Sequence, residues 1–514
     1  MEIKKEKLSW IENVVKKTTQ IDADLDVIVP DSKPDIKKIL QIDANVETTN
    51  CELQNDRILL CGNVYFNVIY MPEDVPMMQS IRVTAPFTDI VAVNGVTPEM
   101  DGILKADILS VNYRIINGRK FSVKSVVEAE INVNKTMTIE SVSEISGSDI
   151  QVKNSHVEFL TKSGQCCKNI VINEKIIIPD TEPAIGEMLN VSAKVNEYSI
   201  KLINNKAILK GDAKIMCTYA DAVAGDVFSV NTVVPFTEIF DIDGIRTDDL
   251  CNAMVETTIC EYNCVENSAG EVRSVETKSV LSVNASVMRD EKCVVVGDCY
   301  ATDKRLDIVT VDINLPQKIN NVDHNDTIKT NITVADNEPM VKKVYDVFSK
   351  AYIDSVEPSA GRVSVNGVID NYILYVTKDD SAPIYCIKNE VEFCHTFDCG
   401  ICDSPDGSFC VEALNTSYVL NSEDSVELRI NYRINGIIYN VKKTKLITDI
   451  IQTDIKTETE KTSIVVYFVQ DNETLWDVAK KYFTTTDTIL KVNELPDGEV
   501  EKGMRLLIPK NKRA

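Results

Sequence analysis

The sequence predicts a mainly β protein: three repeated antiparallel β domains, each with a short helix, followed by a small βααβ domain. Three observations lead to this prediction. A short phrase rich in proline and acidic residues occurs three times at domain-sized intervals. Each copy is followed by a stretch in which apolar and polar residues alternate, as they do in a half-buried strand. The C-terminal end changes to the three- and four-residue spacing of helices. The predicted domains are residues 1–148, 149–300, 301–448 (degenerate) and 464–514, with a polar linker at 449–463.

The repeated phrase marks a bend in the chain. Its copies begin at Pro30, Pro179 and Ala335, which are 149 and 156 residues apart. Aspartate bonds readily to the backbone of a turn, and the second proline of the phrase suits the first position of a helix. We therefore expect a strand, a turn and a short helix in each copy. The third copy has Ala335 where the first bend proline belongs, so this unit departs most from the pattern.

One long strand follows each bend, at residues 58–70, 207–219 and 363–375. Every second residue along it faces inward and is apolar or glycine, with Asn371 as an exception. A glycine lies 32 residues after the first bend position, and a tyrosine closes the strand eight residues later. These residues are Gly62, Gly211 and Gly367, and Tyr70, Tyr219 and Tyr375. Glycine inside a strand indicates a bulge or a close approach of the backbone, so we expect the three glycines to superpose.

Two further landmarks support the repeat. A Pro-Phe pair at residues 86–87 recurs at 235–236 and, as Glu-Phe, at 392–393. Asn-Tyr-Arg-Ile at 112–115 recurs at 431–434, and we interpret Gly118, Gly436 and, in the second unit, Gly270 as the turns that follow. Residues 1–20 predict an amphipathic helix or strand. The alternation fits either a sandwich or a barrel.

Charge and hydropathy limit the classes of partner. The chain of 514 residues has a net charge of −24, which argues against nucleic acid and anionic membranes. The excess lies in residues 1–462, because 463–514 hold eight basic and eight acidic residues. No apolar run approaches the roughly 18 residues of a membrane-spanning helix. The start of the chain is too charged for a signal peptide, so we expect a cytoplasmic protein.

No pattern of catalytic residues stands out. The sequence contains no phosphate-binding loop, no nucleophile elbow and no His-Glu-x-x-His motif. It has only three histidines and fifteen scattered cysteines. One cluster supplies ligands of the kind zinc prefers: Cys394, His395, Cys399, Cys402 and Cys410. Its spacing is half of a standard zinc pattern, so we interpret these cysteines as reduced thiols, with zinc or redox pairing as the alternative. No catalytic residue, cofactor or metal is expected.

The C-terminal stretch combines strand and helix signals. A strand around 467–470 precedes a turn, and Thr474 with Asp477 resembles a capping box. A helical stripe of Leu475, Val478, Ala479 and Tyr482 follows. A second helix at about 487–493 and a strand at 503–509 complete the pattern. This pattern resembles a LysM module, a βααβ domain that typically binds N-acetylglucosamine-containing glycans, over residues 466–510.

The resemblance to LysM implies a groove between two loops. Its residues are Asp471, Asn472, Glu473 and Thr474 in the first loop, and Asn493, Glu494, Leu495 and Pro496 in the second. The family usually has Gly-Asp-Thr where this chain has residues 472–474 as Asn-Glu-Thr. Asparagine tolerates positive φ, so the turn is retained, but the change bears on sugar binding because the turn borders the groove. We interpret Trp476 as a packing residue rather than a platform for sugar.

The bend phrase, the strand glycine and the Pro-Phe pair together resemble the SPOCS domain of spore-coat-associated proteins in endospore-forming bacteria. With the LysM-like module, the resemblance covers nearly the whole chain. It implies a spore-coat morphogenetic protein made in the mother cell and located at the forespore surface. The implied partner is a SpoIVA-like cytoskeletal ATPase that coats the forespore, with other coat proteins as further partners. Composition and spacing alone do not indicate this role.

Three functions are weighed on this basis. The first is a non-catalytic adaptor or scaffold of spore-coat assembly. The second is a peptidoglycan-binding adaptor that acts through the LysM-like module. The third is a cell-wall hydrolase, which should have an export signal and a catalytic domain, and the sequence shows neither. We favour the first function and expect the groove to bind the ATPase rather than a glycan.

Overall fold

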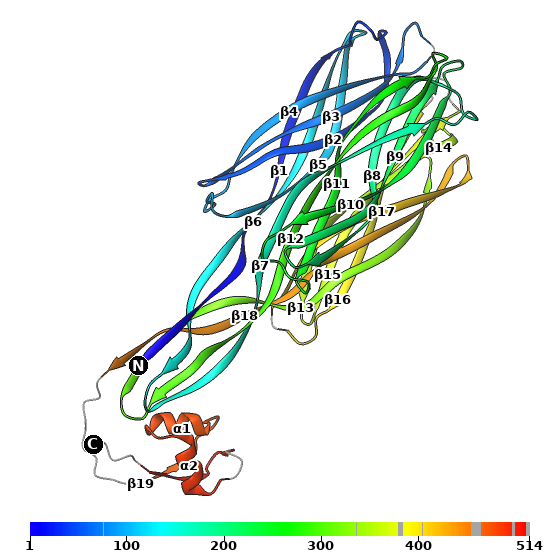
Figure 1. The fold of residues 1–514 in the computed structure, drawn as a ribbon. Helices are drawn as coiled ribbons and strands as arrows, with labels where there is room; N and C mark the ends of the chain where they lie inside the picture. The colour runs from blue at the N-terminus through cyan, green and yellow to red at the C-terminus, as the bar shows by residue number, and fades with distance from the viewer. Residues whose placement is uncertain are drawn as a thin grey trace.

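The protein is an elongated assembly of β-strands with a small helical domain at one end (Figure 1). The computed structural model describes residues 1–75, 77–335, 337–378, 384–402, 404–453, 464–495 and 499–509. Strands of the first repeat are β1 (Glu2–Ile28), β2 (Ile36–Gln54), β3 (Arg57–Pro72), β4 (Gln79–Ala92), β5 (Asp101–Asn117) and β6 (Lys120–Ser146). Those of the second are β7 (Ile150–Ile177), β8 (Ile185–Ile203), β9 (Lys206–Asp221), β10 (Val227–Asp241), β11 (Leu250–Glu266) and β12 (Val272–Ala301). Those of the third are β13 (Arg305–Thr333), β14 (Val341–Ser359), β15 (Arg362–Thr377), β16 (Ile384–Asp398), β17 (Pro405–Ser422) and β18 (Ser425–Thr453).

Each repeat is a sandwich of two three-stranded antiparallel sheets. In the first repeat the strand orders are β2-β3-β4 and β1-β6-β5, and the same orders recur in the second and third repeats. In the second repeat a single pairing, Val272 with Ile185, also joins the two sheets. Side chains of both sheets share one core, as Phe66 of β3 and Phe121 of β6 do. The prediction of three antiparallel β repeats is confirmed, and the choice between sandwich and barrel is resolved in favour of the sandwich.

The short helix expected after each bend does not form. Strands β2, β8 and β14 begin directly after the turn, at Ile36, Ile185 and Val341. Each of these strands has a register shift immediately after its first residue. In β2 the shift lets Ile36 and Ile39 both face the core, three residues apart. A β-bulge therefore produced the spacing that suggested a helix. In the third bend, residue 336 lies outside the described residues.

Two smaller predictions change. Residues 1–20 form a strand, part of β1. The fourth landmark was misaligned, because residues 112–115 lie on β5 whereas 431–434 lie on β18, the counterpart of β6. Gly436 accordingly lies inside a strand, where an added Cβ would be 2.4 Å from the carbonyl oxygen of Ser408. Gly118 and Gly270 do lie in turns, as predicted.

The strand glycines occupy one equivalent position. Gly62, Gly211 and Gly367 lie on β3, β9 and β15, the middle strand of the first sheet in each repeat. Each is paired in register with the phenylalanine of the next landmark: Phe87, Phe236 or Phe393. A Cβ added to Gly62 would lie 2.4 Å from both the Glu47 carbonyl oxygen and Cζ of Phe87. The Glu47 carbonyl confirms the predicted close approach of the backbone, and the phenylalanine ring covers the glycine as well.

The longest strands leave the sandwiches as three two-stranded ribbons. In the first repeat β5 pairs with β6 only as far as Asn134, while β1 and β6 remain paired to Glu2 and Ser146. Trp10, Phe159 and Leu315 each lie 20 residues before the first bend position and share one buried cluster. A second shared cluster lies further along the ribbons. A single ribbon is marginal in water, so the three stabilise one another by packing together.

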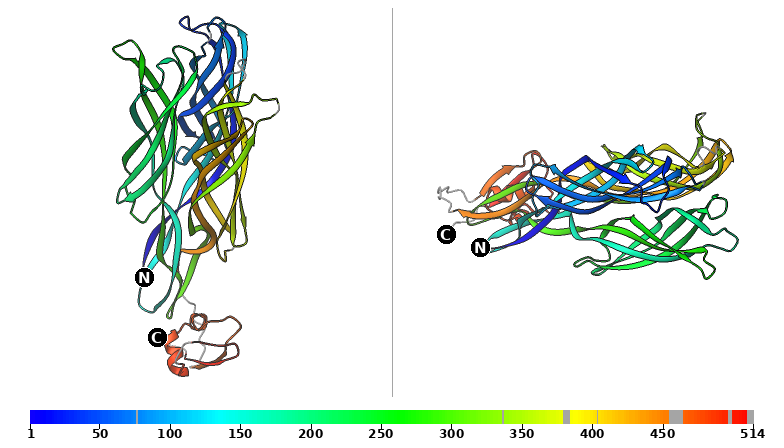
Figure 2. Two further views of the ribbon diagram at one scale, coloured as in Figure 1. Left: turned by 90° about the vertical axis from the view of Figure 1, so that its right-hand side faces the viewer. Right: turned by 90° about the horizontal axis from the view of Figure 1, so that it is seen from above.

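The C-terminal domain lies beyond the ribbon ends (Figures 1 and 2). It consists of β19 (Ile464–Phe468), α1 (Leu475–Lys481), α2 (Thr486–Asn493) and β20 (Arg505–Pro509), with β19 antiparallel to β20. This is the predicted βααβ order. Of the predicted linker at 449–463, residues 449–453 belong to β18, and 454–463 lie outside the described residues. The predicted limits of the four domains, 1–148, 149–300, 301–448 and 464–514, stay a proposal. Neither helix is long enough to cross a membrane.

Candidate functional site

A tyrosine holds the bend in every repeat. The hydroxyl of Tyr70 donates to the carbonyl oxygen of Pro34 at 3.0 Å. Tyr219 and Tyr375 make the same bond to the second proline of their own bends, at 3.1 and 2.8 Å. All three tyrosine side chains are fully buried. Their position at the end of the long strand is therefore explained by the bend that they support.

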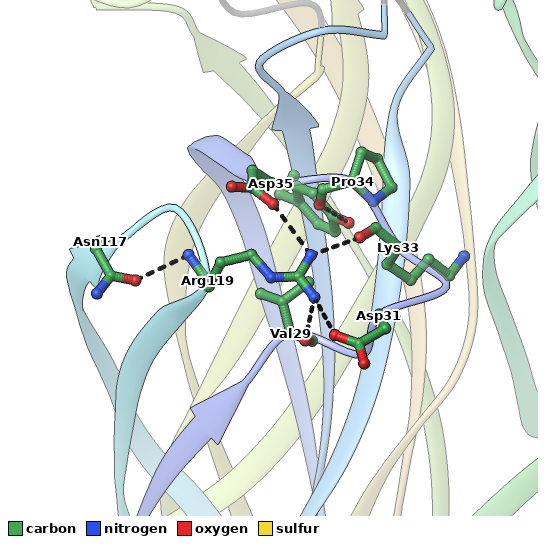
Figure 3. A network of polar contacts seen from close by, with 8 residues as sticks. Val29, Asp31, Lys33, Pro34, Asp35, Asn117 and Arg119 are labelled. Atoms are coloured by element: carbon green, nitrogen blue, oxygen red, sulfur yellow. Dashed lines mark hydrogen bonds and ion pairs between the residues drawn. The ribbon is translucent and has the colours of Figure 1, made fainter.

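An arginine completes the first bend (Figure 3). Arg119 donates to the carbonyl oxygens of Lys33 and Val29 at 2.8 and 3.0 Å. It also pairs with Asp31 and Asp35, each at 3.0 Å. Arg273 donates to the backbone of the second bend in the same way. In the third repeat the corresponding backbone position is Asp424. These contacts fix the chain at the bend, so we assign the repeated phrase to architecture.

The first loop of the C-terminal domain is held largely by its own hydrogen bonds. Asn472 has a φ of 59°, so it supplies the left-handed turn that the sequence predicts. Glu473 accepts from the hydroxyl of Tyr467 at 2.8 Å and from the backbone N–H of Gln470 at 3.0 Å. Thr474 caps α1, and with Asp477 it forms the predicted capping box. Asp471 and Asn472 are exposed, and the former pairs with Lys502 at 2.9 Å. Thus Asp471 and Asn472 are the members of this loop most open to a ligand.

In the second loop, too, some residues are held within the domain and others are exposed to solvent. The amide of Asn493 is bonded to the backbone of β20, accepting from the N–H of Leu507 at 2.7 Å and donating to its carbonyl at 2.8 Å. Glu494 is exposed and ends α2 with a φ of 52°. Leu495 packs against the domain core, so it is not an exposed anchor. Pro496 lies outside the described residues. Of this loop, Glu494 alone among the described residues is presented openly to solvent.

The domain is docked on the second repeat through α1 and the turn after it. Nε1 of Trp476 donates to Oδ2 of Asp298 at 2.7 Å, and Nζ of Lys480 lies 2.5 Å from Oδ1 of the same carboxylate. The hydroxyl of Tyr300 donates to the carbonyl of Thr484 at 2.8 Å, and its ring meets the Trp476 ring edge-on. Asp298 follows a register shift in β12, and such bulges redirect side chains. The interpretation of Trp476 as a packing residue is confirmed, although its partner is another domain.

Docking leaves an apolar sheet face open to solvent. Val465 and Tyr467 of β19 pack towards the helices. The alternate residues Ile464, Val466 and Phe468 are 58%, 54% and 54% exposed, and Leu507 of β20 is 36% exposed. We call these four residues the outer apolar face. β19 leads into the first loop, and Leu507 of β20 is bonded through its backbone to Asn493 of the second loop.

Comparisons with known protein families divide the chain in the same way as the structure, into three repeats and a C-terminal domain. Residues 35–116, 184–265 and 340–417 match the family model described as "SipL, SPOCS domain". Residues 467–509 match the LysM domain. The chain contains three SPOCS domains and a C-terminal LysM domain. No match was found among curated proteins or among solved structures.

Each SPOCS match covers the four strands from the bend onward, for example β2 to β5. The ribbon strands β1, β6 and their counterparts lie outside the matches. SPOCS and LysM domains are non-catalytic binding domains. The SPOCS domains indicate a sporulation-related role, and the LysM domain indicates peptidoglycan binding. The sequence therefore identified the domain content correctly.

Charged groups lie between the SPOCS repeats. Asp43 of the first repeat accepts from Asn190 of the second at 3.3 Å, and burial raises the pKa of its carboxyl to about 6. Tyr198 of the second repeat donates to Glu412 of the third at 2.5 Å. Burial raises the pKa of Glu412 to about 7. No sequence pattern pointed to these residues. Alternation predicts which face of a strand a side chain occupies, but it does not predict which residues of another repeat pack against that face.

Cys399 and Cys402 of the predicted cysteine cluster lie beside each other, but the other members are not gathered around them. Cys399 and Cys402 direct their thiols to the carbonyl oxygens of Phe397 and Gly400. Cys410 receives a hydrogen bond from Asn252 of the second SPOCS repeat at 3.6 Å, and Cys394 is exposed. His395 instead lies beside His324 and Asp326. Within the described part of the chain, the group of possible metal ligands that come together contains no cysteine.

Proposed function

We propose that this protein is a non-catalytic adaptor of spore-coat assembly in the mother cell, at the forespore surface. Its LysM domain would bind the forespore-coating cytoskeletal ATPase, and the SPOCS repeats would present that domain at the end of the ribbons. Further coat proteins would bind the SPOCS repeats. Support comes from the domain content, which combines a sporulation-related repeat with a binding module.

The observation that carries the partner assignment is the outer apolar face. Its four residues are more than one-third exposed on a domain that is already docked on the opposite side. Exposed apolar residues next to polar loops are typical of protein–protein interaction sites. Glu494 is exposed and follows Asn493, whose side chain bonds to Leu507; its acidic charge suits a partner with a basic surface.

The alternative is a peptidoglycan-binding adaptor that uses the loops at 471–474 and 493–496. The LysM family favours it. One observation argues against peptidoglycan binding. Hydrogen bonds within the domain already engage the polar side-chain atoms of Glu473, Thr474 and Asn493. Two of the eight expected groove residues, Asp471 and Glu494, are exposed carboxylates.

Co-purification from sporulating cells tests the proposal. The double variant Val466→Ser, Phe468→Ser should reduce recovery of the ATPase at least tenfold, because interface anchors cost about 1–2 kcal/mol each when truncated. Ile116→Ser is the matched control, since Ile116 is 51% exposed on the first SPOCS repeat. Binding of the purified chain to insoluble peptidoglycan, with ATPase recovery unchanged by the double variant, would favour the alternative.

A further inference from the structure

The third SPOCS repeat carries polar side chains where the other two have a buried apolar pair. Nine residues before the first bend position, the first repeat has Ile21 paired with Val127, and the second has Ile170 paired with Leu281. All four are buried. The corresponding pair in the third repeat consists of Asp326 on β13 and Tyr432 on β18. This strand pair of the third repeat therefore carries a carboxylate and a hydroxyl where the other two repeats carry only apolar side chains.

Two histidines meet at the same place. His324 lies two residues before Asp326 on β13, and His395 comes from β16 of the opposite sheet. The ring centroids of the histidines are 4.6 Å apart. Nε2 of His395 is 3.4 Å from Oδ2 of Asp326. One ligand atom from each of the three side chains lies within 4.8 Å of the other two. Two of the three histidines in the chain thus converge on one carboxylate.

The geometry approaches that of a metal site. Zn²⁺ binds histidine nitrogen and carboxylate oxygen at about 2.0–2.2 Å. In a tetrahedron with such bonds, neighbouring ligand atoms are about 3.4 Å apart, which is the observed distance between His395 and Asp326. Imidazole and carboxylate together suit first-row divalent ions, zinc in particular. A shift of under 2 Å at His324 would bring the remaining ligand within range, which is about the size of a rotamer adjustment.

We propose that the third SPOCS repeat binds one first-row divalent metal ion, Zn²⁺ foremost, through His324, Asp326 and His395. The ion joins β13 of one sheet to β16 of the other. It thereby links the two sheets at a position where the first two repeats carry a buried apolar pair. The chain supplies three ligands, and water takes the fourth position. This proposal revises the expectation of a metal-free chain, which rested on the cysteines.

Tyr432 is a positioning residue in this site. Its hydroxyl lies 2.5 Å from Nε2 of His395 and 3.5 Å from Oδ2 of Asp326. Its side chain is 1% exposed, and it belongs to the core of the repeat. When Nε2 binds the ion, the tyrosine O–H turns to Asp326 and orients that carboxylate. Such outer contacts commonly fix the orientation of metal ligands.

Metal titration of the full chain tests the proposal. The chain is stripped with a chelator, and Zn²⁺ is then added in a calorimeter, with metal content measured after dialysis. We expect one zinc per chain and a higher Tm with zinc, because an ion that binds the folded state stabilises it. His324→Gln, His395→Gln and Asp326→Asn should each weaken binding at least tenfold. Asp326→Asn should leave the fold intact, because the carboxylate is 46% exposed, so weaker binding by this variant would not result from misfolding.

Two controls separate this site from other ligands. His156→Gln alters the remaining histidine, which lies on β7 of the second repeat. The double variant Cys399→Ser, Cys402→Ser removes the thiols that the sequence suggested. Both should bind zinc like the parent chain, and Co²⁺ should give no thiolate charge-transfer band. The proposal fails if the parent takes up no stoichiometric metal, if folded His324→Gln and Asp326→Asn variants bind like the parent, or if the cysteine variant loses the ion.

Discussion

Asp298 makes two of the contacts that dock the LysM domain, in addition to those of Tyr300, and replacing Asp298 with alanine should favour release of the domain. The carboxylate accepts the Trp476 indole N–H and pairs with Lys480. A hydrogen bond to a charged group contributes about 1.5–3 kcal/mol, and a partly exposed ion pair about 0.2–1 kcal/mol. We therefore expect a loss of roughly 2–3 kcal/mol, which lowers the ratio of docked to undocked domains about 30- to 150-fold.

Tryptophan fluorescence measures this release directly. The chain has two tryptophans, so a Trp10→Phe background leaves Trp476 as the only reporter. Undocking exposes its ring to water, so the emission should shift to longer wavelength and become easier to quench. Asp298→Asn keeps one oxygen acceptor for the indole and should show a smaller shift. Asp290→Ala is the control, since Asp290 is exposed on the same strand. Identical emission from Asp298→Ala and the control would refute the assigned contact.

Two further predictions concern the SPOCS repeats. Gly62→Ala should destabilise the first repeat by about 1–3 kcal/mol, because the new methyl group would lie 2.4 Å from a backbone oxygen and from the Phe87 ring; unchanged urea unfolding would show that the strands can separate at no cost. Stability should fall as pH rises from about 4 to 7. The pKa of Asp43 is raised in the folded state to about 6 from an ordinary value of 3.8, so its favourable contribution is present below about 4 and lost as pH rises through 6. Glu412, whose pKa is raised to about 7, acts in the same sense over a window that extends to pH 7. Asp43→Asn should flatten the change in Tm between pH 4 and 7, whereas Asp22→Asn, at an exposed position, should retain it; equal pH profiles for the two variants would contradict the assignment.

Local pattern predicted the strands and failed where the pattern was ambiguous. The alternation in residues 58–70 correctly indicated β3, and the glycine within it indicated a close approach of the backbone, which the Glu47 carbonyl makes. The spacing of Ile36 and Ile39 suggested a helix because a β-bulge places both on one face. Periodicity does not distinguish that case from a helical turn.

Contacts between distant residues left no local signal. Asp298 and Trp476 are 178 residues apart, and nothing near either of them marks the other. His324 and His395 are separated by 71 residues, so a search for short ligand spacings found only the cysteines near His395. The groove residues were placed by resemblance to LysM. Sequence did not reveal that Asn493 and Leu495 serve the fold of the domain.

Binding of the purified ATPase to the full chain and to a chain that lacks residues 464–514 tests the central claim most directly. The experiment is done by calorimetry, with circular dichroism confirming that the SPOCS repeats stay folded. The account predicts that deletion lowers affinity at least 100-fold, since it removes the outer apolar face together with Asp471 and Glu494. Unchanged affinity after deletion would place the partner site in the SPOCS repeats and contradict the account.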